Sequence, residues 1–191
     1  VFDEIDEVPK VSFSYECSGA TVVVMALIDL ATAAYAARTT NALVAAPLVM
    51  LELRGNCLGS EAYRIFSGSG ELSKLKYLNL AENGIDAGAA TRLAAEAKAA
   101  ALEELVLDNN TLGLGASSIV TDTKGLPSLR VLRMCQNGIT DEAIRGIAVA
   151  LRQPDNSWHL EVLDLRGNAV SDYSFVVRGS TSQASCQVHM D

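Results

Sequence analysis

Leucine recurs with a fixed spacing through the middle of the chain. Five nine-residue segments share the pattern LxxLxLxxN, and only one of their fifteen Leu positions departs from it, as Met134. Because side chains on a strand alternate between two faces, the pattern predicts one short strand per segment with its leucines pointing inward. Repetition of the unit predicts a stack in which neighbours bury one another's apolar faces. The segments are residues 48–56, 75–83, 102–110, 129–137 and 160–168.

The spacing between the segments leaves room for a helix on the return path. The asparagines that end consecutive segments lie 27, 27, 27 and 31 residues apart. After Asp86, which is placed to cap a helix, residues 87–100 are rich in strong helix formers. Residues 142–151 repeat apolar side chains at helical spacing. Weaker helices are predicted at 60–66 and 116–121.

Two of the connecting segments begin alike, with Asn-Gly-Ile. They are NGIDAGAATRLA (83–94) and NGITDEAIRGIA (137–148). Together with the LxxLxLxxN units they resemble the ribonuclease-inhibitor-like subclass of leucine-rich repeats, over about residues 48–175. The resemblance implies an α/β solenoid, a right-handed β-α superhelix with short parallel strands on the concave face and helices on the convex face. Ran GTPase-activating proteins and several mitochondrial accessory factors belong to the same broad group.

The asparagines that end the segments are predicted to be structural. A side-chain amide at this position can bond to backbone groups that lose their partners where the chain leaves the sheet. Stacked units therefore predict an asparagine ladder, formed by Asn56, Asn83, Asn110, Asn137 and Asn168.

We expect three regions along the chain. Residues 1–24 form an N-terminal arm and cap, in which Val11–Tyr15 alternates like a strand. Residues 25–175 form the repeat domain, and its first unit is a degenerate repeat at 25–33 in which Ala33 replaces the asparagine. Residues 176–191 form a tail, with Cys186–Met190 as a candidate for a last edge strand.

Charge and hydropathy narrow the classes of partner. The net charge is −8 and the sequence pI is about 4.8, so nucleic acid and anionic membrane surfaces are disfavoured as partners. The most apolar stretch, residues 21–37, is shorter than a membrane span and carries Asp29 in its middle. We therefore predict no transmembrane segment.

No pattern of reactive residues points to catalysis. The two histidines, His159 and His189, stand in no acid–nucleophile arrangement, and phosphate-loop, zinc-protease and serine-hydrolase motifs are absent from the sequence. The four cysteines have no metal-ligand spacing and are expected to be free thiols in a reducing compartment. The prediction is a protein with no catalytic residue, metal or cofactor.

The outward positions of the strands predict the binding face. The first column across the strands is Leu27, Met50, Tyr77, Glu104, Val131 and Val162. The second is Asp29, Glu52, Asn79, Val106, Arg133 and Asp164, and the third is Ala31, Arg54, Ala81, Asp108, Cys135 and Arg166. An apolar column with a charged border is typical of a protein-binding patch. The predicted contact set is the first column together with Glu52, Arg54, Arg133 and Arg166.

These features favour a non-catalytic interaction scaffold that is an accessory subunit of a multi-subunit protein complex. Binding is expected through the concave face and the solenoid ends. Two alternatives remain at this point: a GTPase-activating protein of the Ran type, and the repeat fragment of an intracellular receptor. An intracellular location is expected, and the initial Val1 also allows a mitochondrial protein whose transit peptide has been removed.

Overall fold

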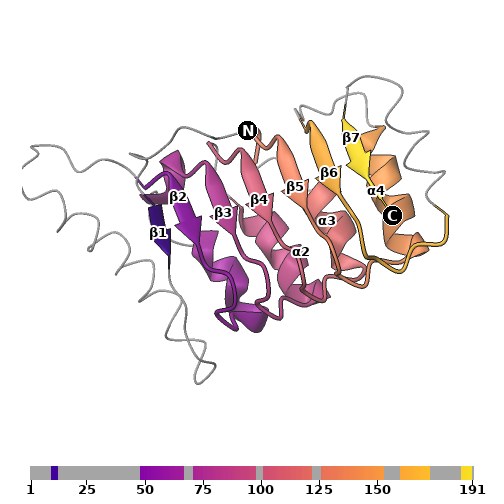
Figure 1. The fold of residues 1–191 in the computed structure, drawn as a ribbon, viewed down its shortest axis with the longest axis horizontal. Helices are drawn as coiled ribbons and strands as arrows, with labels where there is room; N and C mark the ends of the chain where they lie inside the picture. The colour runs from indigo at the N-terminus through magenta and orange to yellow at the C-terminus, as the bar shows by residue number, and fades with distance from the viewer. Residues whose placement is uncertain are drawn as a thin grey trace, which may run out of the picture.

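Seven short parallel strands lie side by side in the order in which they occur in the chain (Figure 1). The computed structural model describes residues 10–12, 48–66, 71–97, 101–121, 126–152, 160–172 and 186–190. Each strand is three residues long. The strands are β1 (Lys10–Ser12), β2 (Met50–Glu52), β3 (Tyr77–Asn79), β4 (Glu104–Val106), β5 (Val131–Arg133), β6 (Val162–Asp164) and β7 (Gln187–His189).

The central residue of each repeat strand is a buried leucine. Leu51, Leu78, Leu105, Leu132 and Leu163 face each other in register and are at most 1% exposed. The leucine at the next inward position, or Met134 in its place, is equally buried. The predicted inward orientation of the leucines is confirmed, and with it the leucine-rich-repeat form of the α/β solenoid.

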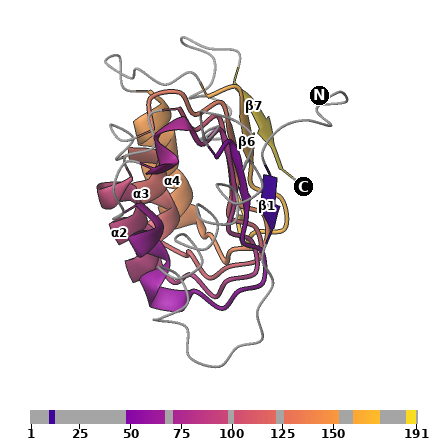
Figure 2. The same ribbon diagram turned by 90° about the vertical axis from the view of Figure 1, so that its left-hand side faces the viewer.

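Helices cover one face of the sheet (Figure 2). The described helices are the 3-10 helices η1 (Gly59–Phe66) and η2 (Glu71–Lys74) and the α-helices α2 (Ala87–Glu96), α3 (Gly115–Thr121) and α4 (Asp141–Leu151). Asp86 caps α2 as predicted, because its Oδ1 accepts the N–H of Ala89 at 2.7 Å. None of the helices that the structure describes has the length and apolar character needed to cross a membrane.

Asn83, Asn110 and Asn168 each join their own turn to the preceding repeat through both atoms of the side-chain amide. The Oδ1 of Asn110 accepts the backbone N–H of Asn83 and of Ile85, both at 3.0 Å. Its Nδ2 donates to the carbonyls of Leu80 at 3.0 Å and Leu107 at 2.8 Å. Asn83 and Asn168 repeat this arrangement one repeat earlier and two repeats later. Backbone groups that the turn exposes are thereby paired inside the protein.

The residue before each ladder asparagine has left-handed backbone geometry. Its φ is +71° at Gly55, +58° at Glu82, +55° at Asn109, +53° at Gln136 and +70° at Gly167. This region is costly for residues other than glycine, so three of the five corners are strained. The hydrogen bonds of the neighbouring asparagine hold the corner in this geometry.

Small residues allow the helices to approach closely. A Cβ atom built on Gly115, the first residue of α3, would lie 2.8 Å from the Cα of Ala87 in α2. A Cβ on Gly146 in α4 would lie 2.9 Å from the Cβ of Ser117 in α3. Real Cβ atoms do not approach neighbours this closely, so glycine is required at both contacts.

The N-terminal edge differs from the prediction. β1 pairs directly with β2, with Lys10 opposite Met50 and Val11 opposite Leu51. The neighbour of β2 is therefore a strand from the arm, and the prediction that the degenerate repeat at 25–33 places Leu27 beside Met50 is wrong. Strand pairing uses backbone groups that every residue has, so apolar spacing alone could not decide which segment pairs. Leu27 itself lies outside the described residues.

The C-terminal edge is β7, which pairs with β6 at the place predicted for a last edge strand. Val188 lies opposite Leu163 and, with Cys186 and Val170, packs half-buried against the core. The edge strand of the described sheet thus has Val instead of Leu at its centre.

Replacing Gly115 with alanine should destabilise the fold by about 1–3 kcal/mol, because the new methyl group collides with the backbone of Ala87. Gly88→Ala is the matched control, since its Cβ would meet only Asp86 Oδ1 at 3.4 Å. The control should leave the free energy of unfolding unchanged or raise it slightly. Urea unfolding of both variants measures this, and equal stabilities would contradict the close contact.

The ladder predicts that replacing an asparagine lowers the stability of the fold by an amount that depends on how deeply that asparagine is buried. Asn110→Ala removes five hydrogen bonds at a site that is 5% exposed, so we expect the free energy of unfolding to fall by at least about 3 kcal/mol. Asn168 is half-buried, so water can replace part of the hydrogen bonding that Asn168→Ala removes. This variant should therefore lose less stability than Asn110→Ala. Thermal and urea unfolding compare the two. A larger loss of stability in Asn168→Ala than in Asn110→Ala would argue that the buried ladder bonds are not the cause of the destabilisation.

Candidate functional site

The concave face of the sheet carries the side chains that point away from the helices. Strand register aligns them in the predicted columns. In the first column Met50, Tyr77, Glu104, Val131 and Val162 are all half-buried. The large exposed hydrophobic side chains among the described residues are Leu114 and Val149, which lie on the helical side. The apolar column is therefore less exposed than the sequence alone suggests.

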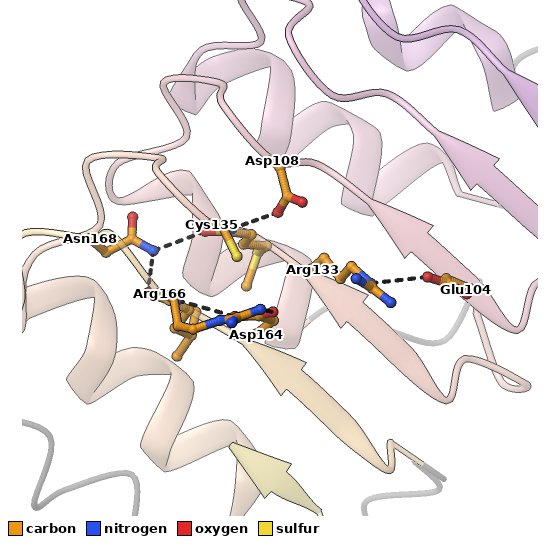
Figure 3. Close-up of polar contacts among 9 residues, drawn as sticks. Glu104, Asp108, Arg133, Cys135, Asp164, Arg166 and Asn168 are labelled. Atoms are coloured by element: carbon orange, nitrogen blue, oxygen red, sulfur yellow. Dashed lines mark hydrogen bonds and ion pairs between the residues drawn. The ribbon is translucent and has the colours of Figure 1, made fainter. Parts of the chain in front are cut away.

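Glu104 divides this column into two apolar pairs. Its Oε1 accepts a hydrogen bond from Arg133 Nε on the neighbouring strand at 3.1 Å (Figure 3). The Glu104 side chain is 15% exposed and that of Arg133 is 47% exposed. Val131 and Val162 lie together on one side of this ion pair, and Met50 and Tyr77 lie together on the other.

Two further ion pairs fix the remaining arginines of this face. Arg166 donates to both carboxylate oxygens of Asp164, at 2.9 and 2.6 Å. Arg54 donates to Glu82 Oε1 at 2.6 Å, and this pair is open to solvent. Each arginine predicted for the contact surface thus already has an acidic partner.

Asp108 and Cys135 meet where β4 and β5 end (Figure 3). Asp108 Oδ1 accepts the backbone N–H of Cys135 at 2.7 Å. Burial, hydrogen bonding to Asp164 and the charge of Asp108 together raise the pKa of the Cys135 thiol to about 12. A thiol with this pKa is protonated at neutral pH and is a poor nucleophile.

Two opposing effects act on the pKa of the Asp164 carboxyl group. Burial raises its pKa, but hydrogen bonds from Arg166 and from the Cys135 thiol outweigh burial and lower the pKa to about 2. Its side chain is 6% exposed. Asp164 is therefore ionised at neutral pH although it is buried.

A shallow hollow of about 380 Å³ lies over β3 and β4. Four residues of the predicted contact set line it, namely Arg54, Tyr77, Glu104 and Arg133. Burial raises the pKa of the Tyr77 hydroxyl, and the carboxylates of Glu52 and Glu104 raise it further. The remaining lining residues are Asn79, Ala81, Val106, Asp108 and Asn109.

A family model described as a leucine-rich repeat matches residues 71–94 and 157–172. These matches fall on the second and the last of the five units, which the structure stacks in one sheet. The chain folds as a leucine-rich-repeat solenoid. No curated protein matches the chain significantly.

The concave face of this leucine-rich-repeat solenoid brings together only part of the predicted set. Met50, Glu52, Val131, Val162 and Arg166 lie outside the lining of the hollow. Asp108 lies in the predicted third column but not in the predicted contact set, although the structure places it in the lining of the hollow. Asn109 could not be found by strand alternation, because it lies at the left-handed corner.

The cysteines require a correction. Cys57 is disulfide-bonded, whereas Cys135 and Cys186 are free. The prediction of free thiols is therefore wrong at Cys57. No spacing rule could reveal this bond, because the distance between two cysteines in space depends on how the intervening chain folds. Within the described residues, no three His, Cys, Asp or Glu side chains form a group able to hold a metal ion.

The ionised, buried Asp164 predicts a specific acid sensitivity. Its pKa is lower in the folded chain than the ordinary 3.8, so its stabilisation is complete above about pH 4 and disappears as the pH falls to about 2. The difference corresponds to on the order of 2 kcal/mol at neutral pH. Asp164→Asn should be less stable than the parent at pH 7 and approach it near pH 2.

Unfolding by urea at a series of pH values tests this expectation. Arg166→Gln serves as a second variant, because removal of the guanidinium should raise the pKa of Asp164 towards its ordinary value and make the loss of stability in acid smaller. A stability difference between Asp164→Asn and the parent that does not vary with pH would contradict the assignment.

Proposed function

We propose that this protein is a non-catalytic protein-binding scaffold whose concave face contacts a partner. The observation that carries the proposal is the arrangement of two half-buried apolar pairs around the Glu104–Arg133 ion pair. Partly exposed apolar side chains next to fixed charges give a protein interface both contact area and specificity. The free thiol of Cys135 on this face is protonated at neutral pH and unsuited to nucleophilic chemistry.

The rigidity of the face supports the same role. The columns come from consecutive strands whose register is fixed by backbone pairing, and the ladder asparagines hold the corners behind them. A surface ordered before binding loses little conformational entropy when a partner arrives. We further propose that the partner belongs to a multi-subunit complex in which this chain is an accessory subunit.

The proposal also covers the subclass of the repeat and the compartment of the protein. The unit length and the helices on the return path support the ribonuclease-inhibitor-like subclass. The expectation of a reducing compartment rested on free thiols, and the disulfide at Cys57 removes that support, because such bonds persist mainly in oxidising environments. A mitochondrial location stays a prediction.

Affinity capture from extracts of the native source tests the concave face. We expect Tyr77→Glu and Val162→Glu to lose the proteins that the parent chain retains, because each places a charge in an apolar pair of the face. Val149→Glu is the control, since Val149 is 56% exposed on α4. It should retain the same proteins as the parent.

Thermal unfolding of all three variants shows whether they fold. If folded Tyr77→Glu and Val162→Glu capture the same proteins as the parent, the concave face is not the contact surface. Loss of capture by Val149→Glu alone would move the interface to the helical side.

A further inference from the structure

A disulfide-bonded cysteine lies close to the N-terminal edge of the described sheet. Cys57 follows β2 by five residues and is half-buried. Cys135 and Cys186 are free thiols, so Cys17 is the cysteine of this sequence that is left as a partner for Cys57. Cys17 itself lies outside the described residues. Within this chain, elimination therefore leaves a bond between the first unit and the arm that carries β1.

The strand register leads to the same pair of cysteines. Ser12 of β1 lies opposite Glu52 of β2, and the two strands are parallel. Cys17 follows Ser12 by five residues. Cys57 follows Glu52 by the same number. An arm that stays in step with the first unit thus brings the two cysteines opposite each other. Neighbouring strands lie about 4.8 Å apart, which is within the range of about 4.4–6.8 Å between the Cα atoms of a disulfide.

The backbone at Cys57 does not account for a cysteine there. Its φ is +52°, in the left-handed region that favours glycine. The residue that follows the ladder asparagine is Gly84 in the second unit and Gly138 in the fourth, with φ of +65° and +64°. Cysteine is more costly than glycine in this geometry, so the side chain of Cys57 has to contribute something that glycine lacks. The disulfide is that contribution.

The strand β1 needs such a bond to stay on the sheet. It is three residues long, and in the described part of the chain it pairs with β2. Residues 13–49 separate the two strands in the sequence. So short a strand forms few hydrogen bonds to offset the entropy that is lost when a long connection closes. A covalent bond just beyond both strands keeps their ends together and lowers this entropic cost.

We propose that a disulfide between Cys17 and Cys57 is a redox-controlled latch that holds β1 on the edge of the repeat array. A thiol reductant opens the latch: one thiolate attacks a sulfur of the bond, and a second thiol completes the exchange. Two electrons and two protons pass to the two cysteines, and the reductant becomes a disulfide. β1 then leaves, and backbone groups of β2 lose their partners. The latch does not depend on a partner at the concave face.

Peptide mapping of the oxidised full chain tests the bond. Free thiols are alkylated first, and the chain is digested with trypsin without reductant. We expect the peptide of residues 11–38, which contains Cys17, to be joined covalently to the peptide of residues 55–64, which contains Cys57. The joined species should separate on reduction. A thiol at Cys57 that is alkylated without reduction, or a link from Cys57 to another peptide, would overturn the proposal.

Amide hydrogen exchange measured by mass spectrometry tests the latch. Dithiothreitol should speed exchange in β1 and β2 by about tenfold or more, because the released edge opens to water. Exchange in β4–β6 and in β7 at the other edge should not change, since each unit contacts only its neighbours.

Cys17→Ser should behave without reductant as the reduced parent does, and dithiothreitol should have no further effect on it. Cys135→Ser is the matched control, because it removes a cysteine that is already a free, half-buried thiol. It should keep the full difference between the oxidised and the reduced protein.

Two results of the exchange experiment would overturn the latch. Equal exchange of β1 and β2 with and without dithiothreitol would show that the bond does not hold the edge. Faster exchange throughout β3–β6 in Cys17→Ser would show that the bond supports the whole array instead of one strand.

Discussion

The architecture depends on one interaction, the pairing of the ladder asparagine amide with backbone groups of two repeats. Three-residue strands leave most of each repeat outside the sheet, so the turn after each strand would bury unpaired N–H and C=O groups. The amide of Asn110 pairs four such groups at 3.0 Å or less, three of them in the preceding repeat. The same bonds hold corners such as Glu82 and Gln136 in a left-handed geometry that these residues otherwise disfavour.

The sequence predicts this core because each core position tolerates few residues. A leucine at the centre of a strand fills a fixed volume between the sheet and the helices, so its spacing reveals both the strands and the repeat. The caps and return helices follow from local propensity, as Asp86 shows. The edge is different, because β1 joins through backbone bonds that Lys10–Ser12 can form as well as any other segment.

The binding face is only partly predictable. Alternation along each strand identified Tyr77, Glu104 and Arg133, and the observed register puts Glu104 beside Val131, within reach of Arg133. How far each side chain is covered depends on its neighbours in three dimensions, so the half-burial of the apolar column was not visible in the sequence. The ionisation of Asp164 likewise results from contacts with Arg166 and Cys135 that no local pattern encodes.

The place of the hollow along the array has a consequence for motion. In a stacked array each unit contacts only its neighbours, and terminal units open at lower free energy because they break one interface instead of two. β3 and β4 have strands on both sides, and α2 packs against both η1 and α3. Local opening therefore begins at the ends, near β1 and β7, and the hollow keeps its shape while the ends exchange their amide hydrogens with water.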